Sequence, residues 1–209
     1  MRYFWPLAAG LVGVIILVVV LVIVLTRSAP AFAMKGAVNW KTLPGLQTGK
    51  PPWGANSSTL QNRLPLVKLT ALPQEALAFH IHQHLDMYVD GKHVNLPAFI
   101  GIATDPTSPS GFVLSEMHTH KPDGIIHVES PQDLKYQLKQ LFGEWGVRIT
   151  SSCLGSFKGS CVNLKWWVNG NPQVGDPGNL VLKPHQEIVI SIGTPPKTIP
   201  KSYTFPPGY

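Results

Sequence analysis

Two groups of closely spaced histidines are the residues of this sequence most suited to chemistry. The first group, His80, His82 and His84, lies in a segment that is predicted to be a β-strand. Side chains of a strand alternate between its two faces, so these imidazoles are expected to point in the same direction. A face that carries three imidazoles is costly to bury without partners, and protonation would crowd like charges on it.

The second group is predicted to lie on a hairpin. His118 and His120 precede the segment 121–124, Lys-Pro-Asp-Gly, in which proline presets φ and Asp-Gly tolerates positive φ. A turn centred on the Pro-Asp pair places His118 opposite His127 and puts His120 on the same face. The hairpin is therefore expected to gather three imidazoles.

Clustered imidazoles are typical ligands of zinc and copper. The predicted metal ligands are His80, His82, His84, His118, His120 and His127. For a single ion, the favoured set is His82, His118, His120 and His127. The carboxylates predicted to support these ligands are Glu129, which shares a strand face with His127, and Asp86. Met87 and Met117 offer thioethers that would suit copper, and the alternative to metal binding is a solvated or purely structural histidine face.

Two hairpins and one helix must position these side chains. The predicted strands of the hairpins are 78–89, 93–102, 112–120 and 124–129. The first hairpin turns at Asp90-Gly91, a strong hairpin signal. A helix is expected to follow the second hairpin, with Ser130 as its N-cap, Pro131 at its first position and Gly146 after its end.

The order of elements from Phe112 onward is hairpin, helix and three further strands, which is the order of a β-grasp. Residues 167–170, Trp-Val-Asn-Gly, and residues 182–190 resemble the closing strands of ubiquitin-like sulfur-carrier proteins. This resemblance implies an α+β fold, with a mainly antiparallel sheet, one packed helix and an N-terminal extension formed by the first histidine-bearing hairpin. It does not imply sulfur-carrier activity, because this chain has Pro-Pro-Gly-Tyr at 206–209 where those proteins have a diglycine.

The segment from Leu7 to Leu25 is an unbroken apolar run of about the length that crosses a bilayer. We expect residues 7–25 to be a transmembrane helix in the lipid bilayer. The alternative is a signal peptide cleaved after Ala31-Phe32-Ala33. Positive charge is slightly greater after the run than before it, which by itself favours a cytoplasmic domain.

The two cysteines favour the opposite orientation. Cys153 and Cys161 lie in one flexible loop, and a disulfide between them is typical of an oxidising compartment. Free thiols and half of a zinc site are the alternatives. We therefore predict a single-pass protein of the cell membrane with its domain outside the cytoplasm.

The predicted organisation has four parts: a membrane anchor (1–27), an extended tether (28–74), a globular histidine-rich domain (75–194) and a proline-rich tail (195–209). With 209 residues, of which 44% are hydrophobic, the chain can form one domain besides the anchor. The net charge of +6 comes from scattered residues without a basic helix, so nucleic-acid binding is not expected.

Four motifs together resemble an uncharacterised family of bacterial membrane-anchored proteins. They are His-Ile-His-Gln-His-Leu-Asp at 80–86, Met-His-Thr-His at 117–120, Gly-Ile-Ile-His-Val-Glu-Ser-Pro at 124–131 and Phe-Pro-Pro-Gly at 205–208. The resemblance implies a membrane location and no particular activity. The function predicted from the sequence is metal binding, of copper or zinc, at the cell surface. The alternatives are a metal-dependent enzyme and an interaction module that binds another envelope protein without metal.

Overall fold

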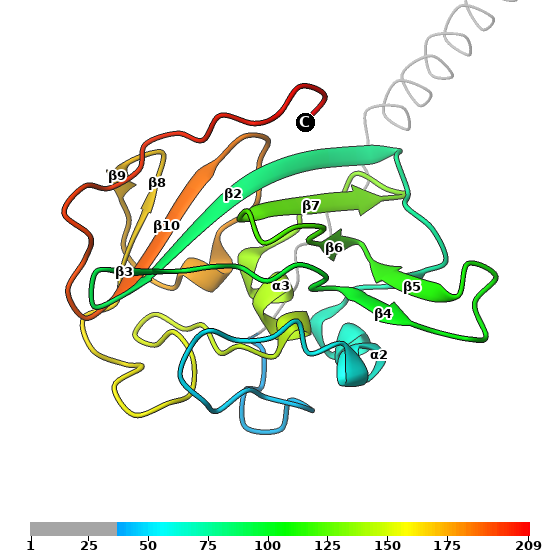
Figure 1. The fold of residues 1–209 in the computed structure, drawn as a ribbon, viewed down its shortest axis with the longest axis horizontal. Coiled ribbons are helices and arrows are strands. Elements are labelled where there is room, and N and C mark those ends of the chain that lie inside the picture. The colour runs from blue at the N-terminus through cyan, green and yellow to red at the C-terminus, as the bar shows by residue number, and fades with distance from the viewer. Residues whose placement is uncertain (1–36) are drawn as a thin grey trace, which may run out of the picture. The chain divides into compact units, whose positions relative to one another are not determined.

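The computed structural model describes residues 37–209, which form two β-sheets and a few short helices (Figure 1). The strands are β1 Ala71–Leu72, β2 Phe79–Val89, β3 Lys92–Val94, β4 Ile102–Thr104, β5 Phe112–Ser115, β6 Met117–His118, β7 Ile125–Ser130, β8 Lys165–Val168, β9 Asn171–Pro172 and β10 Glu187–Ile192. The helical segments are η1 Ser57–Thr59, α2 Leu60–Arg63, η2 Leu64–Val67, α3 Leu138–Trp145 and η3 Pro177–Asn179. The predicted mixed α+β class is confirmed.

Strand β2, which carries the first histidine group, lies inside the larger sheet. The strand order of that sheet is β6-β7-β2-β10-β8-β9, and β3 also pairs with β2 (Figure 1). Strand β2 is antiparallel to β7, with His82 opposite His127, and parallel to β10, with His84 opposite Glu187. Strand β2 is therefore a central strand of the sheet, and the prediction that its hairpin is an N-terminal extension of the β-grasp-like part is wrong.

The two faces of β2 have different roles because its side chains alternate. Ile81, Leu85 and Met87 join the hydrophobic core. The residues of α3 that join the same core are Leu138, Leu141, Phe142 and Trp145. His80 and His82 occupy alternate positions of the strand and point to the opposite face, away from this core. Burial of the apolar face stabilises β2 in the sheet. The gain in free energy is about 25 cal/mol per Å² of apolar surface removed from water.

The predicted return strand of the first hairpin is too long. Asp90 and Gly91 turn the chain with φ values of 48° and 75°, as expected, but the return strand β3 ends at Val94. The chain then turns again at Gly101, whose φ is 72°. A Cβ at Gly101 would collide with the Met117 carbonyl oxygen, so this loop packs closely on β6.

The predicted strand 112–120 is divided between the two sheets. Strand β5 pairs with β1 and β4 in the smaller sheet, whereas β6 pairs with β7 in the larger one. Between them, the buried Glu116 carboxylate accepts hydrogen bonds from the Thr70 amide (2.9 Å) and the Tyr136 hydroxyl (3.3 Å). These contacts fix the crossing point from one sheet to the other. The predicted pairing of His118 with His127 is confirmed.

Helix α3 begins later than predicted. Ser130 is still in strand β7, opposite Phe79, and its hydroxyl is hydrogen-bonded to the Tyr136 hydroxyl at 2.6 Å. The helix is instead capped by Gln137, which forms a capping box with Gln140. Its predicted end is confirmed, because Gly146 takes the left-handed conformation there.

Residues 37–74 are not an extended tether. Val38, Trp53 and Leu60 are buried in the hydrophobic core, and the Trp145 indole donates a hydrogen bond to the Gly54 carbonyl at 2.7 Å. Among residues 37–209, no helix has both the length and the apolar character needed to cross a membrane. The predicted span at 7–25 lies outside the described residues.

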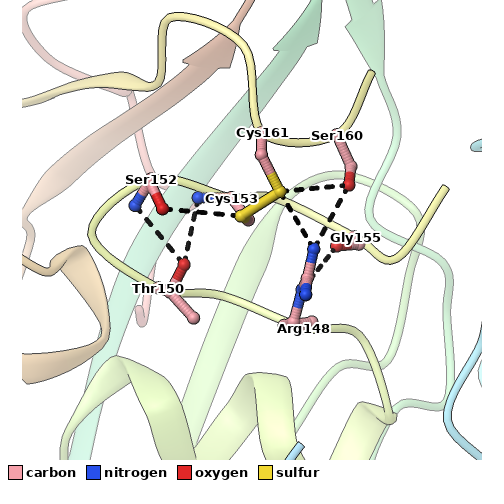
Figure 2. The surroundings of a disulfide bond; sticks show 7 residues. All are labelled: Arg148, Thr150, Ser152, Cys153, Gly155, Ser160 and Cys161. Atoms are coloured by element: carbon pink, nitrogen blue, oxygen red, sulfur yellow. Dashed lines mark hydrogen bonds between the residues drawn. A yellow bond between two sulfur atoms is a disulfide. The ribbon is translucent and has the colours of Figure 1, made fainter. Parts of the chain in front are cut away.

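The predicted disulfide between Cys153 and Cys161 is present (Figure 2). Arg148 holds the loop that the disulfide closes, since it donates hydrogen bonds to the Gly155 carbonyl at 3.0 Å and to Cys161 Sγ at 3.0 Å. The bond and the guanidinium together fix a segment that has little regular secondary structure.

Replacement of both cysteines by serine is expected to lower the free energy of unfolding by about 2–3 kcal/mol, because the unfolded chain loses a cross-link. Denaturant unfolding of the protein, followed by circular dichroism, measures this loss. Chemical reduction of the unsubstituted protein serves as the matched control and should give a similar decrease. Equal stability of the oxidised, reduced and substituted forms would contradict the prediction.

Candidate metal centre

Three neighbouring strands bring the histidines of the two groups together. Strand β7 lies between β2 and β6, so His127 has His82 opposite it on one side and His118 on the other. Glu129, two residues along β7, lies opposite His80. Directly opposed residues share a face of the sheet, so all these side chains project toward one region.

The donor atoms of His80, His82, His127 and Glu129 form a compact set, which we call group A. The Nε2 atom of His82 lies 3.0 Å from Nε2 of His80 and 3.1 Å from Nδ1 of His127. Glu129 Oε1 lies 3.2 Å from His80 Nε2 and 3.3 Å from His127 Nδ1. Neighbouring ligands of a tetrahedral zinc ion, bound at about 2.0–2.1 Å, are roughly 3.3 Å apart. Group A therefore has the spacing of ligands around one ion.

A second set, group B, consists of His118, His120, His127 and Glu129. The Nε2 atoms of His118 and His120 are 3.1 Å apart, and Glu129 Oε2 is 3.8 Å from His118 Nε2. Nδ1 of His118 donates a hydrogen bond to the Ser115 carbonyl at 3.0 Å. That bond assigns the ring proton to Nδ1, which leaves the lone pair on Nε2 free for a metal.

The protonation states of the buried members favour metal binding. Burial lowers the pKa of His82 to about 4, with further lowering from the neighbouring His127 and His80. Burial likewise lowers the pKa of His118 to about 4. Burial by itself would raise the pKa of Glu129, but its hydrogen bond with His127 and its electrostatic interactions with His118 and His80 outweigh burial and lower it. The site thus combines the lowered pKa values of the His82 and His118 imidazoles with the lowered pKa of one carboxylate.

His84 is not part of either group, so the prediction that it shares the cluster is wrong. Its Nδ1 donates to Glu187 Oε2 at 2.8 Å, and its Nε2 donates to the Asp123 carbonyl at 3.0 Å. Burial alone would lower the pKa of His84, but its hydrogen bond and charge interaction with Glu187 raise it above the ordinary value. The ring of Tyr203 stacks on the imidazole with 3.8 Å between centroids. Both ring nitrogens are therefore engaged as donors.

Asp86 belongs to the surroundings of His84. Asp86, His84 and Glu187 have donor atoms within 4.8 Å of one another, and they form a third arrangement that could hold an ion. However, Asp86 Oδ1 is paired with His93 Nε2 at 2.7 Å, and the Glu187 carboxylate is paired with His84. Asp86 is thus placed away from groups A and B, which it was predicted to support.

The two methionines predicted as thioether donors lie elsewhere. Met87 and Met117 are fully buried in the core, because each alternates with a residue of the histidine face. The donor atoms that meet in groups A and B are therefore nitrogen and oxygen, without sulfur.

Residues of the tail complete the surroundings of the site. The ring of Tyr209 lies over those of His82 and His127, with centroid distances of 4.6 and 5.4 Å. His185 Nε2 donates a hydrogen bond to the Tyr209 carbonyl at 3.1 Å. The C-terminal end of the tail lies next to β2 (Figure 1). No periodic pattern in the sequence indicated these contacts or the pairing of Glu187 with His84.

No protein-family model, curated protein or solved structure matches this chain. The function has to be inferred from the geometry of the site.

NMR of the metal-free protein tests the protonation states of His118 and His84 directly. At about pH 6, near the ordinary histidine pKa, His118 should be neutral with its proton on Nδ1, because its pKa is about 4. His84 should carry protons on both nitrogens, because its pKa is raised. Long-range proton–nitrogen correlation spectra distinguish these forms. A doubly protonated His118, or a neutral His84, at that pH would contradict the assignment.

Proposed function

We propose that this protein binds copper or zinc through the histidine cluster of β2, β6 and β7, and that it buffers, carries or senses the ion at the cell surface. The observation that carries this proposal is the spacing of 3.0–3.3 Å between neighbouring donor atoms of group A. Three imidazoles and one carboxylate match the preferences of zinc and of divalent copper.

The ligand set favours binding over catalysis at group A. Four protein ligands fill a tetrahedral site, whereas catalytic zinc sites keep a position open for water or substrate. The ion would still be reached from solvent, because the side chain of His80 is 35% exposed. A site of this kind can take up and release an ion without a chemical reaction.

Metal content provides the test. The full chain, purified in detergent without a histidine tag and then dialysed against zinc, is expected to retain stoichiometric zinc. The double variant His80→Ala/His82→Ala removes two of the four group A ligands and should lose affinity strongly. Elemental analysis measures the retained metal, and His93→Ala is the matched control because His93 belongs to neither group. An unsubstituted protein without retained zinc or copper would instead support an interaction module that works without metal.

We also infer that the larger sheet is a β-grasp whose first strand is β2. Its support is the order β7-β2-β10-β8-β9, in which the central strands β2 and β10 are parallel, together with the position of α3 between β7 and β8 in the chain. In this assignment, the segments from β3 to β6 are an insertion between the first two strands. The insertion supplies His118 and His120.

We further propose that residues 7–25 anchor the protein in a membrane with the metal-binding domain outside the cytoplasm. The Cys153–Cys161 disulfide supports this location, because such bonds persist in oxidising compartments. Protease added to spheroplasts should degrade the domain while a cytoplasmic marker protein survives. Protection of the domain until the cells are lysed would reverse the orientation.

A further inference from the structure

The two oxygens of Glu129 face different sets of imidazoles. Oε1 lies 3.2 Å from His80 and 3.3 Å from His127, within group A. Oε2 lies 3.8 Å from His118, on the group B side, and has no hydrogen-bond partner. Glu129 is only 2% exposed. A buried carboxylate oxygen without a partner costs free energy, so a cation near Oε2 would satisfy an atom that is otherwise unpaired.

The imidazoles beside Oε2 are suited to hold that cation. The hydrogen bond from His118 Nδ1 to the Ser115 carbonyl leaves Nε2 as the free nitrogen. That Nε2 lies 3.1 Å from His120 Nε2, a separation that suits two ligands of one ion. A tetrahedral ion in group A has no remaining position for either nitrogen. Group B therefore holds donors that a single ion would leave unused.

Of the two residues common to both groups, Glu129 is the better bridge. A carboxylate can bind one ion with each oxygen while it keeps its single negative charge. An imidazole binds two ions only after it loses both ring protons. His127 Nδ1 already faces the group A donors, at 3.1 Å from His82 Nε2 and 3.3 Å from Glu129 Oε1.

We propose that the cluster is a dinuclear metal centre bridged by Glu129. The first ion is held by His80, His82, His127 Nδ1 and Glu129 Oε1. The second is held by His118, His120 and Glu129 Oε2. Two ions bridged in this way are typically about 3.5–4 Å apart. This inference rests on the proposed function, because it concerns the same histidine cluster.

The second ion would have a position open to a small ligand. Three protein donors leave a tetrahedral ion one ligand short, which is the arrangement that binds water or an exogenous oxygen donor. The side chain of His120 is 33% exposed, and the nearby side chain of Glu75 is 48% exposed, so solvent reaches this side. The second ion is thus the one at which an exchangeable oxygen ligand, such as water or a carboxylate, would bind.

Native mass spectrometry of the full chain, titrated with zinc alone, tests the stoichiometry. The unsubstituted protein and the His93→Ala control are expected to bind two ions. His80→Ala/His82→Ala and His118→Ala/His120→Ala should each bind one. One ion in the unsubstituted protein would overturn the dinuclear centre but leave the proposed function intact, whereas no ion would remove both. Two ions in either double variant would overturn the assignment of ligands.

A second measurement needs no variant, so it remains decisive if a substitution prevents folding. The unsubstituted protein loaded with two equivalents of divalent copper should show spin coupling in its electron paramagnetic resonance spectrum. Coupling is expected because a shared carboxylate holds the ions close together. Two uncoupled copper signals of full intensity would overturn the bridge.

Discussion

The pairing of β7 between β2 and β6 is the constraint on which the rest of the site depends. His127 has only two lateral neighbours in the sheet, and both are histidines, His82 and His118. The backbone ladder fixes the spacing of these residues, so the imidazoles are positioned without the ordering of a flexible loop. Pre-organisation of this kind lowers the entropy cost of binding. A shift of one residue in either pairing would turn the imidazoles toward the core.

The same strands must also keep the domain folded. The apolar side chains of β2, Leu85 and Met87 among them, are buried on the face that α3 covers, and comparable apolar positions on β7 and β10 complete that face. The hydrophobic face therefore determines which residues can join the histidine cluster. This division explains why Met117, although adjacent to His118 in sequence, contributes packing and no ligand.

Electrostatics distinguishes the histidines that are suited to bind an ion from the one that is not. His82 and His118 are surrounded by other imidazoles and a single carboxylate, and burial keeps them neutral. His84 is also buried, but its hydrogen bond and charge interaction with Glu187 raise its pKa. The alternation of β2 places His82 and His84 on one face, but their neighbours across the sheet differ: β7 supplies His127 opposite His82, whereas β10 supplies Glu187 opposite His84. The neighbouring strand thus decides the chemistry of each position.

Local sequence patterns determined several features of this protein. They indicated the strand that bears His80 and His82, the pairing of His118 with His127, the Asp90-Gly91 turn, the end of the helix at Gly146 and the disulfide, because each of these depends on residues close together in the chain.

Other features of the fold and of the site were decided only by the tertiary structure. The parallel pairing of β2 with β10 joins residues about a hundred positions apart, and it removed His84 from the cluster through Glu187. The division of strand 112–120 at Glu116 and the packing of residues 37–74 likewise depend on distant partners, Tyr136 and the core around α3. Periodicity within a segment predicts which face a side chain occupies, but it carries no information about which segment will lie opposite that face.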